Sequence, residues 1–144
     1  MGNWILHIDD DESEFELLKS AFRQLDQKIE CLHAYSGVDG IKILESELSA
    51  PPDFVFLDVN LGIITGDSVL HQIRSTRELS GLKVIVYTNE DITWRRAFWN
   101  ESGAEYFLTK PYLKQLVDVL KYLFGQAITE AELGVVRQFL IKLK

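Results

Sequence analysis

Acidic side chains stand directly after two short apolar runs of this chain. Residues 4–8 lead into Asp9 and Asp10, and residues 54–57 lead into Asp58. The run 54–57 has the length and the aromatic and β-branched content of a strand that is buried on both faces. A carboxylate at the end of such a strand is a candidate nucleophile or metal ligand, although Asp in this place is more often a turn former. The residues at the other strand ends therefore decide its role.

Polar side chains also follow two later predicted strands. The run 82–87 ends at Thr88, and the run 106–109 is followed by Lys110. In an open, doubly wound sheet the carboxyl ends of the strands lie along one edge, which is where ligands bind. We therefore expect the carboxylates, the Thr88 hydroxyl and the Lys110 ammonium to meet in one shallow cleft.

This set of side chains suits a hard divalent cation together with a phosphoryl group. Mg²⁺ prefers oxygen ligands and keeps several waters, so a few carboxylates would hold it and leave positions for phosphoryl oxygens. Lys110 would neutralise one phosphoryl oxygen, and Thr88 would donate a hydrogen bond to another. A carboxylate nucleophile that forms an aspartyl phosphate is an established covalent strategy. The residues alone therefore point to phosphoryl chemistry.

Predicted helices lie between the predicted strands. The strands are expected at residues 4–8, 29–34, 54–57, 82–87 and 106–109, and the helices at residues 14–25, 36–48, 65–74, 92–102 and 113–124. Alternation of this kind is typical of βαβ units with right-handed crossovers. We therefore expect an α/β fold over residues 1–125, a doubly wound, flavodoxin-like (βα)5 domain with a five-stranded parallel sheet.

Residues 126–144 follow this domain as a predicted helical extension. Thr129 and Glu132 form a capping-box pattern. Leucine or valine at positions 133, 136, 140 and 143 recurs at helical spacing. This pattern predicts an extra C-terminal amphipathic helix over 126–143. The helix either packs back on its own domain or pairs with another chain, so a homodimer is an open alternative.

The composition is ordinary for a soluble globular protein. Acidic residues number 22 against 15 basic ones, giving a formal charge of −7, which disfavours a nucleic-acid partner because phosphate binding needs a basic face. No apolar run is long enough for a bilayer span and no secretion signal is visible, so we expect no membrane association and a cytoplasmic location. Cys31 is the only cysteine, which excludes an internal disulfide.

Four ordered segments of the chain resemble the receiver domain of response regulators in two-component signalling. They are residues 5–11 (ILHIDDD), 56–61 (FLDVNL), 84–88 (VIVYT) and 103–111 (GAEYFLTKP). One such segment alone is weak support. All four occur in order, with matching spacing and within the same alternation of strands and helices, and the resemblance spans residues 3–124.

The resemblance implies a role for each acidic residue at the predicted site. Asp58 is the expected phosphoacceptor. Asp10 and Asp58 are the expected direct ligands of Mg²⁺, with Mn²⁺ as a possible substitute. Asp9 is expected to act through water, and the backbone carbonyl of Asn60 completes the protein ligands.

The resemblance also implies a conformational switch. Thr88 and Lys110 are expected to contact the phosphoryl group, and Phe107 takes the switch-aromatic position of the family. The new charge draws Thr88 inward and Phe107 follows, so the surface around the fourth helix and fifth strand changes as a population shift. The cis peptide of the family is expected at Lys110–Pro111.

The implied partners are those of two-component signalling. A sensor histidine kinase or a phosphotransfer protein is expected to donate the phosphoryl group. A separate effector protein is expected to receive the signal, because no output domain is predicted in the sequence. The chain is not expected to be an enzyme beyond its own phosphoryl transfer and autodephosphorylation.

Two residues depart from the family pattern near the predicted site. Gly62 stands where the family usually has proline, which loosens the loop after Asp58. Asn89 replaces the small residue that usually follows Thr88, so its side chain is expected to restrict the access of water or small phosphodonors.

Several aromatic and histidine side chains have no assigned chemistry. Trp94 and Phe98 share one helix face and Trp99 does not. We therefore expect core packing for at least one of these aromatics and a partner surface for another. His7 and His33 lie within predicted strands and are expected to be structural.

Two other function classes stay open. A haloacid-dehalogenase-like phosphatase would use Asp9 and Asp11 as its Asp-x-Asp motif, but Glu12 and Ser13 follow where that fold needs a glycine. The late acidic pair of that fold is not recognised after Lys110. A phosphorylation-independent, receiver-like interaction domain would lack the acid pair, the acceptor or the lysine, and none of these is missing.

Overall fold

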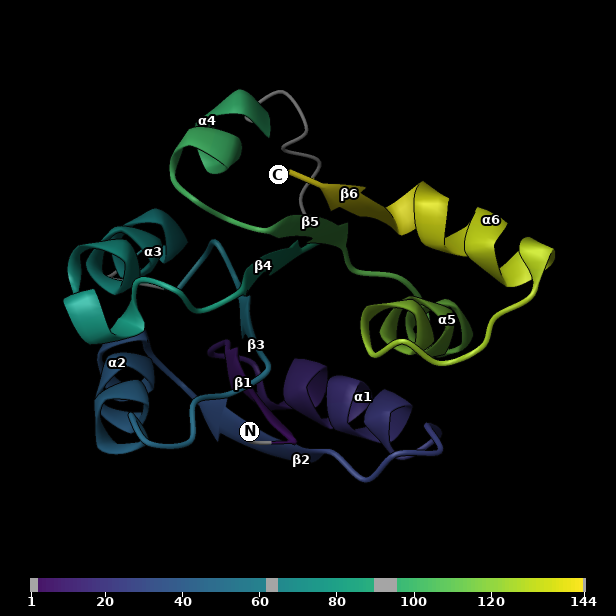
Figure 1. Ribbon diagram of the computed structural model, residues 1–144, viewed down its shortest axis with the longest axis horizontal. Coiled ribbons are helices and arrows are strands. Elements are labelled where there is room, and N and C mark those ends of the chain that lie inside the picture. The colour runs from purple at the N-terminus through teal and green to yellow at the C-terminus, as the bar shows by residue number, and fades with distance from the viewer. Residues whose placement is uncertain (1–2, 62–64, 90–95, 144) are drawn as a thin grey trace.

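A six-stranded sheet forms the centre of the molecule in the computed structural model, which describes residues 3–61, 65–89 and 96–143 (Figure 1). The strand order is β2-β1-β3-β4-β5-β6. Strands β1 to β5 are parallel, and β6 is antiparallel to β5. The strands are β1 (Trp4–Ile8), β2 (Glu30–Ala34), β3 (Phe54–Leu57), β4 (Val84–Thr88), β5 (Tyr106–Thr109) and β6 (Leu140–Lys142).

Helices cover both faces of this sheet. They are α1 (Glu12–Phe22), α2 (Gly37–Ser46), α3 (Gly66–Ser75), α4 (Arg96–Glu101), α5 (Leu113–Leu123) and α6 (Glu130–Phe139), with a 3-10 turn, η1, at Arg77–Leu79. Helices α1 and α5 lie on one face, α2, α3 and α4 lie on the other, and α6 lies beyond α5 (Figure 1). This is the doubly wound, flavodoxin-like arrangement that the alternating pattern predicts.

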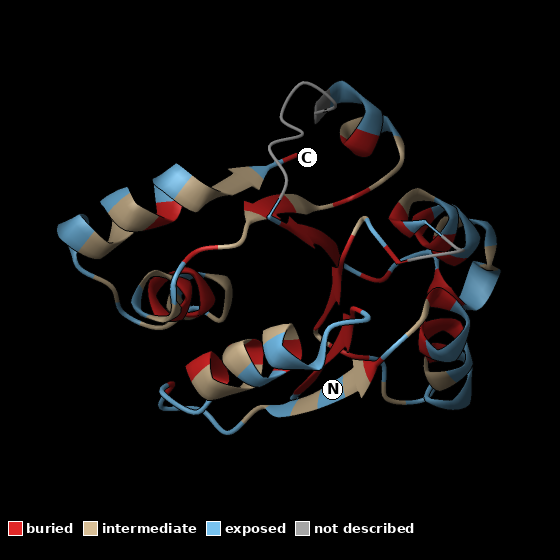
Figure 2. Cartoon of the chain, turned by 180° about the vertical axis from the view of Figure 1, so that it is seen from behind, coloured by how far each residue is buried: buried red, intermediate tan, exposed pale blue. Residues whose placement is uncertain are grey.

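Alternate residues of the strands feed two apolar clusters, one on each face of the sheet. Leu6, Val55 and Val86 belong to the cluster under α2 and α3. Ile5 and Phe56 belong to the cluster under α1 and α5. Burial on both faces explains why the central strands are continuous apolar runs (Figure 2). The sheet is therefore a rigid support for the residues at its carboxyl edge.

The predicted start of the C-terminal helix is confirmed, but its predicted extent is wrong. The capping box of Thr129 and Glu132 is present and α6 begins there, but the helix ends at Phe139. Leu140 to Lys142 form a sixth strand in place of further helix, so the sheet is not five-stranded and not wholly parallel. Without β6, the edge of β5 would present unpaired backbone N–H and C=O groups. A further turn of α6 would not provide partners for these groups, whereas a paired strand does. Pairing with that edge outweighs continuation of the helix.

Gly103 follows the C-terminal end of α4. Its φ is 93°, a left-handed conformation that other residues rarely adopt. Arg74 of α3 packs against it and donates from Nε to the Gly103 carbonyl at 2.9 Å. A Cβ at position 103 would lie 2.7 Å from that Nε atom. The glycine therefore serves both the turn and the close approach of the arginine.

The aromatic residues of α4 have different environments. The Trp99 side chain is buried, with 1% of its surface exposed, whereas Phe98 is 37% exposed. This confirms that at least one of the pair is core. Trp94 and the Gly62 loop lie outside the described residues. None of the helices in the described parts of the chain is long and apolar enough to cross a bilayer.

Candidate functional site

Three carboxylates converge at the carboxyl edge of the sheet, as the strand-end pattern predicts. Asp9 and Asp10 follow β1, and Asp58 follows β3, which is the neighbour of β1. Each side chain offers one carboxylate oxygen, and these three oxygens lie within 4.8 Å of one another. Asp9 and Asp58 are buried and Asp10 is exposed. The cluster fits a hard divalent cation, because such a cation takes carboxylate oxygens and retains waters on its open side.

Asp58 lies in a place where its charge is poorly compensated. Its backbone N–H donates to the Ile8 carbonyl at 3.0 Å, which fixes the residue beside the end of β1. Burial, with a smaller contribution from the neighbouring Asp9, raises the pKa of Asp58 to about 6 against the opposing effect of Lys110. The carboxylate is therefore ionised at neutral pH but is destabilised in that form. The buried Asp58 carboxylate therefore favours the binding of a cation.

The approach of α3 to Asp58 depends on a glycine. The Gly66 N–H donates to the Val59 carbonyl at 3.0 Å at the start of α3. A Cβ on Gly66 would lie 2.5 Å from the Asp58 carbonyl oxygen, closer than side chains come to backbone. The backbone at the start of α3 thus contacts the backbone of Asp58 and Val59 directly.

Asp9 is the best-compensated carboxylate of the cluster. Its Oδ2 accepts from Lys110 Nζ at 2.9 Å, and its Oδ1 accepts from the Asp11 N–H at 2.9 Å. His7 Nε2 lies 3.3 Å from Oδ2, without the geometry of a hydrogen bond. Burial raises the pKa of Asp9, but the contacts with His7, the Asp11 amide and Lys110 outweigh burial and hold the pKa well below its ordinary value.

Lys110 reaches the cluster from the end of β5. Its side chain is 5% exposed, and its ammonium also lies 3.5 Å from Glu14 Oε2 of α1. The same nitrogen lies 5.0 Å from the centre of the Tyr87 ring, within cation–π distance. Burial lowers the pKa of Lys110, and the surrounding carboxylates, Asp9 above all, raise it by more. The lysine is therefore a fixed positive charge beside Asp58.

The peptide bond between Lys110 and Pro111 is trans, so the predicted cis bond is wrong for this structure. An X–Pro bond has only a small intrinsic preference for trans, and the surrounding structure sets the isomer. The Lys110 N–H donates to the Thr88 carbonyl at 2.8 Å, and this bond holds the end of β5 beside the end of β4.

Thr88 and Phe107 lie on the same face of neighbouring strands. Phe107 pairs with Val86 in the register of β4 and β5, and Thr88 is two residues beyond Val86. Side chains two residues apart on a strand share a face, so Thr88 and Phe107 are diagonal neighbours. Both are buried, with about 1% of their surface exposed. This is the spatial relation that a Thr88–Phe107 switch needs.

The remaining predicted site residues are at the surface. Asn60 is exposed, two residues after Asp58, and its backbone interacts with the Asp58 carboxylate. Asn89 is also exposed. It lines a concavity of about 410 Å³ together with Lys110, Tyr112 and neighbouring residues of α1, α5 and α6. This concavity gives the site an open side next to Lys110.

His7 and His33, which are predicted to be structural, belong to an aromatic group beneath the site. The His7 ring centre lies 5.5 Å from that of Tyr87 and 5.9 Å from that of His33. His33 Nε2 is 2.7 Å from the Asp9 carbonyl oxygen, and Phe15 stacks on His33. His7 is two residues before Asp9 on the same strand face, which is the signal that places it beneath the site.

Asp11 does not join the carboxylate cluster. Its Oδ1 accepts from the Ser13 N–H at 2.8 Å and from the Ser13 hydroxyl at 2.6 Å, as the N-cap of α1. An Asp-x-Asp phosphatase would need this carboxylate at the reacting group. The cap therefore disfavours the phosphatase alternative.

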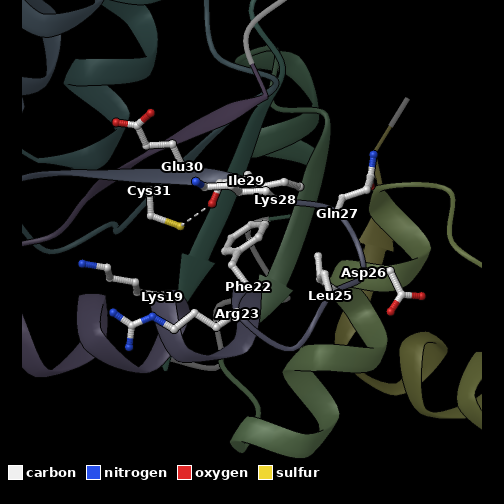
Figure 3. A pocket seen from close by; sticks show the side chains of 10 residues that line it. All are labelled: Lys19, Phe22, Arg23, Leu25, Asp26, Gln27, Lys28, Ile29, Glu30 and Cys31. Carbon is white, nitrogen blue, oxygen red and sulfur yellow. Dashed lines mark hydrogen bonds between the residues drawn. The ribbon is translucent and has the colours of Figure 1, made fainter.

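A separate concavity of about 530 Å³ lies at the opposite, amino-terminal edge of the sheet (Figure 3). Lys19, Phe22, Arg23 and Cys31 are among the residues that line it. Burial raises the pKa of Cys31 to about 12, so the thiol stays protonated. None of the predicted site residues lines this concavity.

The comparisons with known proteins agree with the fold. The family model of the response regulator receiver domain matches residues 5–121. The response regulator MprA of Mycobacterium ulcerans (strain Agy99) is 32% identical over 127 residues, which are 88% of this chain and 52% of that protein. The chain thus spans about half the length of the curated relatives that it matches.

Two solved structures show the same fold at low identity. The phosphorylated cyanobacterial phytochrome response regulator RcpA gives a TM-score of 0.76 at 20% identity, over 89% of this chain and 98% of that one. The Mn²⁺-bound form of response regulator Rcp1 gives a TM-score of 0.73 at 22% identity, over 88% of this chain and 96% of that one.

The chain belongs to the response regulator receiver domain family, whose members act in two-component signalling.

Proposed function

We propose that Asp58 is the phosphoacceptor of this receiver domain, in a phosphorelay that ends on a separate effector protein. The observation that carries the proposal is the convergence of Asp9, Asp10 and Asp58 within 4.8 Å, with Lys110 bonded to Asp9 beside them. Asp9 and Asp58 are the two buried carboxylates of the cluster, and of these two Asp58 forms no ion pair among the described residues, whereas Asp9 pairs with Lys110. Asp58 is therefore the one that is ready to react.

In the proposed reaction, a carboxylate oxygen of Asp58 attacks the phosphorus of a phosphohistidine in line with the leaving imidazole. The new oxygen–phosphorus bond forms as the nitrogen–phosphorus bond breaks, and the imidazole leaves with the electron pair. The protein contributes mainly position and charge neutralisation. The donor is a sensor histidine kinase or a phosphotransfer protein.

Lys110 has to change partners during this reaction. In the structure its ammonium is bonded to Asp9 at 2.9 Å and lies 3.5 Å from Glu14. A phosphoryl group on Asp58 adds negative charge next to this ammonium, and Lys110 then turns toward the phosphoryl oxygens. The Thr88 hydroxyl is drawn to another of these oxygens.

The proposed cation site consists of the Asp10 and Asp58 carboxylates and the Asn60 backbone carbonyl, with Asp9 acting through water. Mg²⁺ is the proposed ion and Mn²⁺ its substitute, because both take oxygen ligands. When bound, the ion supplies charge neutralisation to the phosphoryl oxygens. The raised pKa of Asp58 supports this assignment, since a bound cation would stabilise the carboxylate form that burial, and to a smaller extent Asp9, disfavour.

The proposed output is a population shift that begins at Thr88 and Phe107. These diagonal neighbours on β4 and β5 connect the phosphoryl site to the outer part of the sheet. We further propose that residues 1–125 act as the receiver unit and that the protein works in the cytoplasm.

The decisive experiment is incubation with Mg²⁺ and acetyl phosphate, followed by intact mass spectrometry. The wild type should gain one phosphoryl group, whereas Asp58→Asn should gain none. Asp53→Asn, which removes a carboxylate at the other end of β3, is the matched control and should be labelled like the wild type. Labelling of Asp58→Asn, or none in the wild type, would contradict the proposal.

The cation is tested by Mg²⁺ titration with thermal unfolding as the readout. An ion that binds only the folded state raises the free energy of unfolding in proportion to the logarithm of its concentration. Asp10→Asn should lose most of this gain. Asp11→Asn is the control, because Asn is an equally good N-cap and this side chain lies outside the cluster.

A further inference from the structure

The C-terminal strand β6 is attached directly to the strand that carries the switch residue. Ile141 of β6 pairs with Phe107 of β5 in the antiparallel register. The Leu143 N–H donates to the Glu105 carbonyl at 2.9 Å and extends the pairing by one residue. Figure 1 shows β6 along the outer edge of β5, at the end of the sheet.

The side chains of the C-terminal segment cover Phe107. Directly opposed residues of an antiparallel pair place their side chains on the same face, a few ångströms apart. Ile141 packs against the same apolar cluster that contains Phe107, Trp99 and Leu143. Phe107 is accordingly only 1% exposed. An aromatic residue at the edge-most parallel strand is thus buried by the chain's own C-terminal segment.

The attachment of the C-terminal segment is small. β6 has three residues, and Lys142 is exposed. Among the residues of α6, Val136 is the one that is fully buried. A single ion pair in the described residues, Lys121 with Glu132 at 3.4 Å, joins α6 to α5. A short edge strand that pairs on one side only has few backbone hydrogen bonds to break, so it opens more readily than a central strand.

We propose that the outer edge of β5 is a docking site for an extended apolar peptide, and that β6 occupies this edge until Asp58 is phosphorylated. This inference rests on the proposed function. When Thr88 moves toward the phosphoryl group, Phe107 follows it and moves away from Ile141. The contact beneath β6 is then lost, and the backbone of residues 106–108 becomes available for another strand. The partner segment carries apolar residues at alternate positions, matching Ile141 and Leu143.

The release of β6 is tested by hydrogen exchange on the full chain with and without Mg²⁺ and beryllofluoride. Amides of residues 140–143 should exchange about fivefold faster or more in the beryllofluoride form, which is the size of a typical coupling between two sites. Amides of β1 should not change. Unchanged or slower exchange of β6 would overturn the inference. Protection of β6 that rises with protein concentration would also overturn it, because the strand would then come from a second copy.

Fluorine NMR of bound beryllofluoride separates this inference from the proposed function. If Asp58 binds no beryllofluoride, the proposed function fails. If it binds and β6 is unaffected, only the docking inference fails. Asp58→Asn should abolish both the bound fluorine signal and the faster exchange.

The docking edge itself is tested with a labelled peptide of residues 138–144, QFLIKLK, added to the full chain. Its binding, followed by fluorescence anisotropy, should strengthen about fivefold or more with beryllofluoride. In Ile141→Asp protein, β6 cannot dock and the peptide should bind in both states. Lys142→Ala, whose side chain points to solvent, should behave like the wild type. Equal binding of the peptide to wild type and Ile141→Asp would contradict the docking site.

Discussion

Lys110 Nζ lies 2.9 Å from Asp9 Oδ2, so the ammonium of the site is bonded to a neighbour of the proposed acceptor and not to the acceptor itself.

 Glu14 Oε2 lies 3.5 Å from the same nitrogen on its other side. The ammonium is therefore held by two carboxylates that a phosphoryl group on Asp58 has to outcompete. The strength of the ion pairs with Asp9 and Glu14 sets how readily Lys110 turns toward a phosphoryl group on Asp58.

Removal of the Glu14 charge should make phosphorylation faster. Glu14 is partly exposed, so its ion pair with Lys110 contributes about 0.2–1 kcal/mol, and Glu14→Gln should raise the labelling rate by up to about fivefold. The rate is measured by intact mass spectrometry with acetyl phosphate and Mg²⁺. Glu16→Gln removes an exposed charge from the same helix and should leave the rate unchanged. Slower labelling of Glu14→Gln would mean that Glu14 positions Lys110 productively.

The buried Tyr87 hydroxyl should lower the free energy of unfolding. This hydroxyl has no hydrogen-bond partner in the described residues, and burial raises the pKa of Tyr87, so the group stays neutral. Tyr87→Phe removes the hydroxyl and keeps the ring beside Lys110, and it should raise the free energy of unfolding by about 1 kcal/mol. Tyr87→Leu also removes the ring and should lower that free energy by about 2 kcal/mol. Urea denaturation measures both variants. A destabilised Tyr87→Phe would reveal a partner for the hydroxyl, such as a bound water.

The ionised Asp58 carboxylate should destabilise the fold above pH 6 when no cation is present. Burial raises the pKa of Asp58 from 3.8 to about 6. The proton is therefore bound more tightly in the folded state, and the penalty is complete above pH 6, declines as the pH falls, and is gone below the unfolded value of 3.8. A rise of this size corresponds to roughly 3 kcal/mol at full effect.

Asp58→Asn tests this pH dependence. At pH 8 in a chelator, the variant should be more stable than the wild type by about 1–3 kcal/mol, and the difference should shrink toward pH 4. Chemical denaturation at a series of pH values gives the curve. Mg²⁺ should reduce the difference at pH 8, because a bound cation stabilises the wild-type carboxylate. A difference that does not depend on pH would rule out the charge of Asp58 as its cause.

Much of the fold and the carboxylate cluster follows from local patterns. Asp9, Asp10 and Asp58 end strands that are neighbours in the sheet, and parallel topology alone brings such ends together. Thr88 and Lys110 are placed by the same rule. The residues at strand ends are predictable because the two-residue period of a strand and the direction of a parallel sheet fix their positions.

Contacts between distant segments could not be predicted in this way. Leu140 and Leu143 fit a helical seam in the sequence, yet they belong to the segment that pairs with β5, because the open edge of β5 is a partner that no local pattern reveals. The contact of Glu14 with Lys110 depends on the angle at which α1 packs on the sheet. The trans bond before Pro111 likewise depends on its surroundings and not on the dipeptide.

Gly66 and Gly134 should respond in opposite directions to the same substitution. A Cβ on Gly66 would lie 2.5 Å from the Asp58 carbonyl oxygen and 2.8 Å from the Val59 Cα, and neither backbone atom can move without shifting the acceptor loop. Gly66→Ala should therefore lower the free energy of unfolding by about 1–3 kcal/mol and slow labelling of Asp58.

The matched variant Gly134→Ala lies in the interior of α6, where an added Cβ meets no atom within 4 Å. It should raise the free energy of unfolding by up to about 1 kcal/mol, because alanine loses less backbone entropy than glycine in a helix, and labelling of Asp58 should be unchanged. Urea denaturation and the acetyl phosphate assay measure both effects. If Gly66→Ala were as stable and as readily labelled as Gly134→Ala, the close contact between α3 and the Asp58 loop would not constrain the site.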